Sequence, residues 1–174
     1  MDSKQVRKLV LTALCTALTT VATIVIQIPS PMSGYVNPGD CMVLLSAWLL
    51  GPFAGATAAG VGSALADILT GYTYYAPGTL VIKAAMALTA GLIARAWHRS
   101  PSRRAHPVLS RVLGAFVAEL IMVLGYFAYA ALLLGSGLGA AASIPGNLVQ
   151  GAFGLISSLL LAQMLARAHA FPRD

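Results

Sequence analysis

Charged residues are scarce in this sequence of 174 residues. Asp, Glu, Lys and Arg make up only 9% of the chain, whereas 58% of the residues are hydrophobic. Soluble domains contain roughly 25% charged residues. This scarcity, together with a mean hydropathy of +0.81, excludes an ordinary soluble domain and predicts an integral membrane protein. The net charge of +6 does not call for nucleic acid, because basic residues of membrane proteins gather in cytoplasmic loops.

The motifs of catalysis, ATP binding and metal binding are also missing. The sequence has no Gly-rich phosphate loop ending in Lys-Ser/Thr, no Gly-x-Ser-x-Gly and no His-Glu-x-x-His. The two cysteines, Cys15 and Cys41, have no metal-binding spacing, and we interpret them as packing residues. We therefore expect no enzyme, no metal site and no covalently bound cofactor. Any uphill transport would need a partner or an ion gradient as its energy source.

Long apolar runs are what the sequence does have. They predict an all-α integral membrane protein, a six-transmembrane-helix bundle that forms a single domain over residues 1–174. The expected spans are 8–28, 40–50, 53–70, 78–97, 109–134 and 145–168.

Two of these spans need comment. The first is too long for the core of a cleaved signal and ends at Pro29-Ser30-Pro31, so we expect a retained helix. The second would rise only about 17 Å as a helix, against a hydrocarbon core of roughly 30 Å. Gly51-Pro52 ends it, and small residues follow. Because small residues allow close helix contact, we expect the second and third spans to form a tightly packed hairpin.

The basic residues predict the orientation. Ten of the eleven Lys and Arg residues flank the N-terminus, the 98–107 loop and the C-terminus. Six spans place these three regions on one side, and the positive-inside rule makes that side cytoplasmic. The N- and C-termini are therefore expected in the cytoplasm. The loops 29–39, 71–77 and 135–143, which contain no Lys or Arg, are expected outside.

Four ionisable residues fall within or at the ends of the expected spans. Placing such a residue in a membrane costs free energy, so those that occur there are usually functional. Asp40, Asp67 and Lys83 lie toward the outer ends, and Glu119 lies near the middle. Tyrosine, asparagine and glutamine residues also lie near the outer ends of the expected spans. A pocket of this composition suits a small polar ligand, including an aromatic one. The candidate substrate-binding residues are Asn37, Asp40, Asp67, Tyr72, Tyr74, Tyr75, Lys83, Glu119, Tyr126, Asn147 and Gln150.

Structural roles are open for the same residues. Asp40 could simply cap the second helix. Asp67 and Lys83 could form a structural ion pair. Glu119 could be a protonated carboxyl group bonded to a neighbouring helix, and the tyrosines could form an interfacial belt.

Three stretches between Gly34 and Gly91 point to a family: GYVNPGD, LLGPFAGATAAGVGSALADILTGY and YAPGTLVIKAAMALTAGL. With the chain length, the expected spans and the orientation, they resemble the substrate-binding S components of energy-coupling factor (ECF) transporters, in the riboflavin-type branch. The resemblance implies a multi-pass protein of the prokaryotic cell membrane that captures a vitamin or related micronutrient from outside. It also implies that the first outer loop covers the ligand, which would place Asn37 and Asp40 at the pocket.

The resemblance further implies partners. S components dock on a membrane coupling subunit, the T subunit, which binds two cytoplasmic ATPase subunits. Docking uses small residues on the first helix in an Ala-x-x-x-Ala pattern, and Ala13 and Ala17 match it here. The lipid bilayer is the other expected partner, and nucleic acid is not expected.

The substrate is open at this stage. A small aromatic heterocycle is expected: a pyridoxine-like compound, a pyrimidine precursor or riboflavin, although riboflavin calls for a larger apolar slot than five Phe and two Trp residues suggest. The alternative is a stand-alone ion-coupled transporter in which Asp67, Lys83 and Glu119 form a proton relay. A membrane enzyme or assembly factor is a weaker third interpretation, because catalytic motifs are missing.

Overall fold

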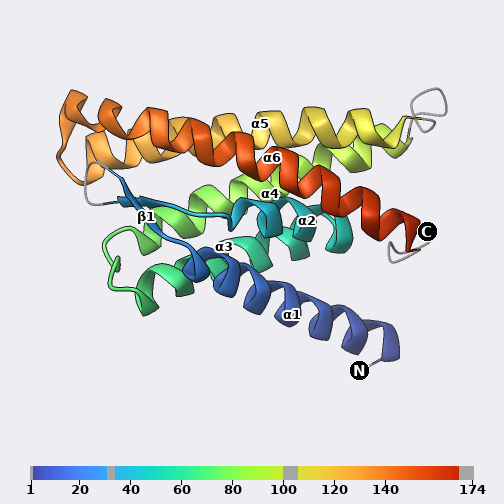
Figure 1. Cartoon of the computed structure of the whole chain (residues 1–174). Helices are drawn as coiled ribbons and strands as arrows, with labels where there is room; N and C mark the ends of the chain where they lie inside the picture. The colour runs from blue at the N-terminus through green and yellow to red at the C-terminus, as the bar shows by residue number, and fades with distance from the viewer. Residues whose placement is uncertain (1, 31–33, 100–105, 169–174) are drawn as a thin grey trace.

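The computed structural model describes residues 2–30, 34–99 and 106–168. Within them the chain forms six α-helices, two short helical segments of other types and one two-stranded sheet (Figure 1). The long helices are α1 (Ser3–Val25), α3 (Pro52–Leu69), α4 (Ala76–Arg99), α5 (Pro107–Ala128) and α6 (Ile144–Arg167), and the short one is α2 (Asp40–Leu50).

Five of the helical segments are long and apolar enough to cross a membrane. These are α1, α3, α4, α5 with its π-helical extension η1 (Tyr129–Leu133), and α6 with the preceding 3-10 helix η2 (Gly137–Ser143). The apolar α2 is too short to count as a sixth. The structure therefore shows a mostly helical protein with five spanning candidates, and the sixth crossing and the placement of the termini stay predictions.

The segment between α1 and α2 differs from the irregular loop expected there. It contains the strands β1 (Ile28–Ser30) and β2 (Gly34–Val36), which pair antiparallel with Ile28 opposite Val36. We call the two paired strands, residues 28–30 and 34–36, the hairpin. The sequence is rich in Pro, Gly and Ser, which favour turns. Pairing with each other also satisfies backbone N–H and C=O groups of both strands.

The break between α2 and α3 follows from two adjacent residues. Gly51 has a φ of 80°, a conformation that favours glycine, and Pro52 occupies the first turn of α3, where its missing N–H costs nothing. The chain then turns back on itself. A Cβ placed on Gly55 would lie 2.6 Å from the Cα of Ala47, so α2 and α3 are packed backbone to backbone as the small residues predicted.

The buried core lies around α2. Val43 and Leu44 have no exposed surface, and they pack with Met86 on α4 and with Ala118 and Met122 on α5. By contrast, large apolar side chains cover the outer faces of the long helices, including Leu9, Leu124 and Phe153. This inside-outside pattern is typical of a helix bundle in lipid.

The connections fall at two ends of the bundle (Figure 1). The start of α1 and the end of α6 lie at one end. The hairpin, the turn between α3 and α4 and the η1–η2 connection lie at the other, which we call the hairpin end. The hairpin end is the one that the charge pattern assigns to the outside.

Candidate functional site

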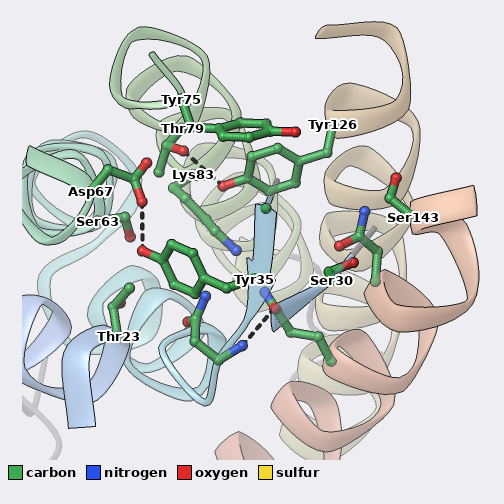
Figure 2. Close-up of a pocket in the computed structure, with 14 residues that line it drawn as sticks. Thr23, Ser30, Tyr35, Ser63, Asp67, Tyr75, Thr79, Lys83, Tyr126 and Ser143 are labelled. Carbon is green, nitrogen blue, oxygen red and sulfur yellow. Dashed lines mark hydrogen bonds between the residues drawn. The ribbon is translucent and has the colours of Figure 1, made fainter. Parts of the chain in front are cut away.

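A pocket opens at the hairpin end, between the hairpin and five helices (Figure 2). The space between its lining atoms, open solvent at the mouth included, is about 540 Å³. Hydroxyl, amide and charged groups predominate among its lining residues: Thr23, Ser30, Gly34, Tyr35, Asn37, Ser63, Asp67, Tyr75, Thr79, Lys83, Tyr126, Ser143, Asn147 and Gln150.

Below the pocket, Lys83 on α4 forms a buried ion pair with Asp40 at the start of α2. Gln150 on α6 donates from Nε2 to Asp40 Oδ2 at 2.7 Å, and its Oε1 accepts the backbone N–H of Asn37 at 2.8 Å. The carboxylate thus ties three helices together. Two of the structural roles left open by the sequence are not the ones observed: the N-cap of α2 is Gly39 rather than Asp40, and Lys83 pairs with Asp40 rather than with Asp67.

Asp67 on α3 stands on another wall of the pocket. Tyr35 in the hairpin donates its hydroxyl to Asp67 Oδ1 at 2.5 Å, and Figure 2 shows the tyrosine pointing at the carboxyl group. Oδ2 of Asp67 is buried and has no hydrogen-bond partner among the described residues, although Thr79 interacts with the carboxyl group. Burial and the neighbouring carboxylate raise the pKa of Tyr35 well above its ordinary value. Tyr35 therefore stays a hydrogen-bond donor to Asp67.

All six tyrosines of the chain form one continuous series of ring contacts at the hairpin end. Tyr35 contacts Tyr72 with 4.6 Å between ring centroids, and the series continues through Tyr74 to Tyr75. Tyr75 then contacts both tyrosines of the α5 region, Tyr126 and Tyr129.

Three of these rings line the pocket: Tyr35, Tyr75 and Tyr126. The Lys83 ammonium lies 5.5 Å from the centre of the Tyr126 ring, a cation–π distance. The Tyr126 hydroxyl donates to Thr79 at 3.1 Å. These three rings therefore place flat apolar surface next to polar groups of the pocket.

Glu119 on α5 lies deeper and does not line the pocket. Only 7% of the residue is exposed, and neither carboxyl oxygen has a hydrogen-bond partner among the described residues. Its neighbours are Asp40 and the α6 backbone at Gly151 and Gly154. The expected bond to a neighbouring helix is therefore not formed within the part of the chain that the structure describes.

The structure gathers most of the candidate residues predicted from the sequence. Seven of them line the pocket: Asn37, Asp67, Tyr75, Lys83, Tyr126, Asn147 and Gln150. Asp40 lies beneath it, and Tyr72 and Tyr74 belong to the tyrosine series without lining the pocket. Among the described residues no cluster of three or more His, Cys, Asp or Glu side chains could hold a metal ion.

Seven further residues line the pocket without having been predicted from the sequence: Thr23, Ser30, Gly34, Tyr35, Ser63, Thr79 and Ser143. Most are small hydroxyl residues, which are as common at packed helix contacts as at binding sites. Tyr35 had a usable signal, because it lies within the GYVNPGD stretch, two residues before Asn37.

The two alanines of the expected docking motif lie on the outer face of α1. Ala13 and Ala17 are exposed, whereas Cys15, Thr19 and Thr23 of the same helix are buried against the bundle. The motif is thus accessible to a partner helix, and docking itself stays a prediction.

Comparison with known proteins agrees with this architecture. The family model described as "ECF-type riboflavin transporter, S component" matches residues 3–167. A Lactococcus lactis subsp. cremoris protein named "Thiamine precursor transporter HmpT" is 29% identical over 173 residues, which is 96% of this chain and 92% of that protein. A Pyrococcus woesei protein named "Uncharacterized protein in gap 3'region" is 43% identical over 138 residues, covering 79% of this chain and 86% of that protein.

The fold also matches a solved structure described as "Structure and mechanism of the S component of a bacterial ECF transporter". The TM-score is 0.68, with 22% sequence identity over 94% of this chain and 97% of that one. These observations define a helical membrane protein with a polar pocket at one end of its bundle. The chain belongs to the S component family of ECF-type riboflavin transporters, and it is accordingly a multi-pass membrane protein of a vitamin-transport family.

Proposed function

We propose that this protein captures a small heterocyclic vitamin or vitamin precursor from outside the cell and delivers it to a T subunit with two ATPase subunits. The observation that supports this most directly is the polar pocket beneath the hairpin, at the end of the bundle remote from the described basic residues of α1 and α6. A binding subunit needs a concave site with a few converging polar groups, and the lining of this pocket supplies them.

The unused polar atoms of the pocket indicate the ligand's chemistry. Ser63 Oγ and Asp67 Oδ2 lie one helical turn apart on α3, and both are buried without hydrogen-bond partners among the described residues. Buried polar atoms are normally paired. A ligand that donates N–H groups, such as an amino group or a ring N–H, would satisfy the Asp67 carboxyl group.

The rings of Tyr35, Tyr75 and Tyr126 supply flat surfaces for an aromatic heterocycle. An amino-substituted single ring, as in a pyrimidine precursor, combines both features. The Lactococcus lactis relative, whose name describes a thiamine precursor transporter, supports this substrate class. A pyridoxine-like ring is the next candidate, and riboflavin would need more apolar wall than the polar lining offers.

The first experiment is native mass spectrometry of the protein purified alone from cells grown in rich medium. We expect one small molecule retained at one-to-one stoichiometry. A thermal-shift panel of thiamine, pyridoxine, riboflavin and simple aminopyrimidines then tests the class. An empty protein that also shows no shift with any of these compounds would contradict the capture function.

A matched pair of variants tests the site. Asp67→Asn keeps the size of the side chain but turns one acceptor into a donor, so it should weaken binding of an amino-substituted ring at least tenfold. Asp2→Asn is the control. Asp2 is exposed at the start of α1, at the end of the bundle opposite the pocket, so this variant should bind the ligand normally. Equal affinity of both variants would remove Asp67 from the site.

The proton-relay alternative requires a chain of contacts from Asp67 through Lys83 to Glu119. The described hydrogen bonds instead join Asp67 to Tyr35 and Lys83 to Asp40. Uptake that stops when the proton gradient is collapsed with ATP kept high would nevertheless favour the relay over the ATP-driven module.

A further inference from the structure

The charges beneath the pocket do not balance if every group is ionised. Asp40 from α2 and Glu119 from α5 are both carboxyl groups, and Lys83 from α4 is the cation facing them among the described residues. From α6, the groups at this level are the amide of Gln150 and the backbone at two glycines.

Other titratable groups nearby do not supply a second cation. From α3, Asp67 is another carboxyl group, and it is engaged with Tyr35. On α5 itself, Tyr126 donates its hydroxyl to Thr79. Glu119 would thus be an unbalanced negative charge if it were ionised.

Asp40 has a complete set of partners for an ionised carboxylate. Oδ1 accepts from the Lys83 ammonium and Oδ2 accepts from Gln150. Glu119 has none, because both of its oxygens are buried and unpartnered among the described residues. The contrast between the two carboxyl groups places the negative charge on Asp40.

The surroundings of Glu119 explain why no donor reaches it. A Cβ on Gly154 would lie 2.8 Å from Glu119 Oε1, and a Cβ on Gly151 would lie 3.2 Å from Oε2. The α6 backbone therefore packs directly on the carboxyl group. The backbone N–H groups there already donate to carbonyl groups of α6 itself. An ionised carboxylate enclosed in this way, in the middle of a membrane protein, is strongly disfavoured.

We propose that Glu119 is a proton-binding site, and that it carries its proton as a neutral carboxylic acid while Asp40 is the ionised partner of Lys83. The proposal concerns the empty protein and does not depend on which substrate is captured. A metal cation is a poorer occupant, because hard cations need several free oxygen ligands and both Asp40 oxygens are already engaged.

Asp40, beside the proton site, is connected to the pocket through hydrogen bonds that the structure shows. Gln150 binds Asp40 with its amide nitrogen and the backbone of Asn37 with its amide oxygen. Ionisation of Glu119 would place a second negative charge beside Asp40 and compete for Lys83. Proton occupancy at Glu119 thus helps hold Lys83 and Gln150 in the arrangement that forms the floor of the pocket.

Infrared difference spectroscopy of the full chain in lipid nanodiscs at neutral pH tests the proposal, with the proton itself as the probe. The wild type should show the C=O stretch of a protonated carboxyl group, shifted in D₂O and lost in Glu119→Gln. The same band should be lost in Asp40→Asn, because Glu119 then ionises to balance Lys83. Asp67→Asn is the control and should keep the Glu119 band.

Thermal unfolding of the same variants gives an independent readout. Glu119→Gln replaces a neutral group with one of the same size and should unfold near the wild-type temperature, whereas Asp40→Asn should unfold at a clearly lower one. Identical spectra of wild type and Glu119→Gln, or a Glu119→Gln variant that fails to fold, would overturn the proposal. Stabilisation by Na⁺ that disappears in Glu119→Gln would also overturn it in favour of a metal cation.

Discussion

Lys83 and Asp40 are 43 positions apart in the sequence, yet their side chains form an ion pair with only 3% and 0% of their surfaces exposed. The pair joins α4 to α2, and Gln150 extends the connection to α6. A short helix that cannot span the membrane by itself is thereby fixed in the centre of the bundle. The pair is therefore expected to matter for stability as well as for the pocket above it.

Lys83→Met should destabilise the protein by about 3–5 kcal/mol, because removal of one member leaves a buried charge without its partner. The loss is measurable as a change in the free energy of unfolding in detergent. The double variant Asp40→Asn, Lys83→Met should lose less than the sum of the two single losses, since no lone charge is left. Strictly additive losses would show that the two side chains do not act as a pair.

Tyr35→Phe removes the hydroxyl that binds Asp67 and should loosen the hairpin. Hydrogen bonds to charged groups contribute about 1.5–3 kcal/mol, so amide hydrogen exchange at residues 34–37 should accelerate by roughly 10- to 100-fold. The matched control is Tyr129→Phe, which loses a bond to the Tyr74 carbonyl away from the hairpin. Unchanged exchange in Tyr35→Phe would mean that other contacts hold the hairpin.

Alkaline pH should destabilise the protein through the same tyrosine. The pKa of Tyr35 is raised in the folded state by burial and then by Asp67, above the ordinary value of 10.0. Above pH 10 the unfolded chain releases this proton while the folded protein keeps it, so the free energy of unfolding falls as pH rises. The stability contributed by Tyr35 is fully present below pH 10. Unfolding temperatures measured from pH 8 to 11 should fall less steeply in Tyr35→Phe, and parallel curves would contradict this.

Gly154→Ala should be destabilising, because the added methyl group would lie 2.7 Å from Asp40 Cβ and 2.8 Å from Glu119 Oε1. Overpacking of this kind costs about 1–3 kcal/mol, measurable as a lower unfolding temperature. Gly139→Ala provides the control, since nothing lies within 4 Å of a Cβ there. If both variants unfold at the wild-type temperature, α6 does not press on the two carboxyl groups as described.

Leu substitution at both Ala13 and Ala17 should abolish uptake in cells while ligand binding by the purified protein stays normal. Bulky side chains on this exposed face of α1 would prevent close contact with the T subunit. Ala152→Leu, exposed on α6, is the control and should support normal uptake. Parallel loss of binding and uptake in the Ala13/Ala17 variant would show damage to the protein rather than to docking.

The elements of the fold were largely predictable, because long apolar runs and glycine or proline breaks are local properties of the sequence. The start of α2 at Asp40 and the break at Gly51-Pro52 are examples. The hairpin was not predicted, since three-residue strands give too short a pattern to distinguish from a loop.

Pairing within the site was harder to predict than its membership. The sequence identifies Asp40, Asp67, Lys83 and Glu119 as ionisable residues that are unfavourable in a membrane, but the one ion pair considered from it joins Lys83 to Asp67, not to Asp40. Which carboxyl group meets Lys83 depends on the depth at which α2 packs against α4, and periodicity in either helix does not contain that information. The serines and threonines of the pocket were not predicted for a similar reason. The sequence does not distinguish a small hydroxyl residue at a helix contact from one that lines a pocket.

The hairpin is bonded to α3 through Tyr35 and Asp67, and the backbone of Asn37, which directly follows the hairpin, is bonded to α6 through Gln150. Both bonds are present in the empty protein, so we expect them to slow the entry and the release of a ligand alike. A ligand held beneath the hairpin should therefore have a long residence time. A capture subunit with slow release can hold a scarce nutrient until a vacant transport complex is met.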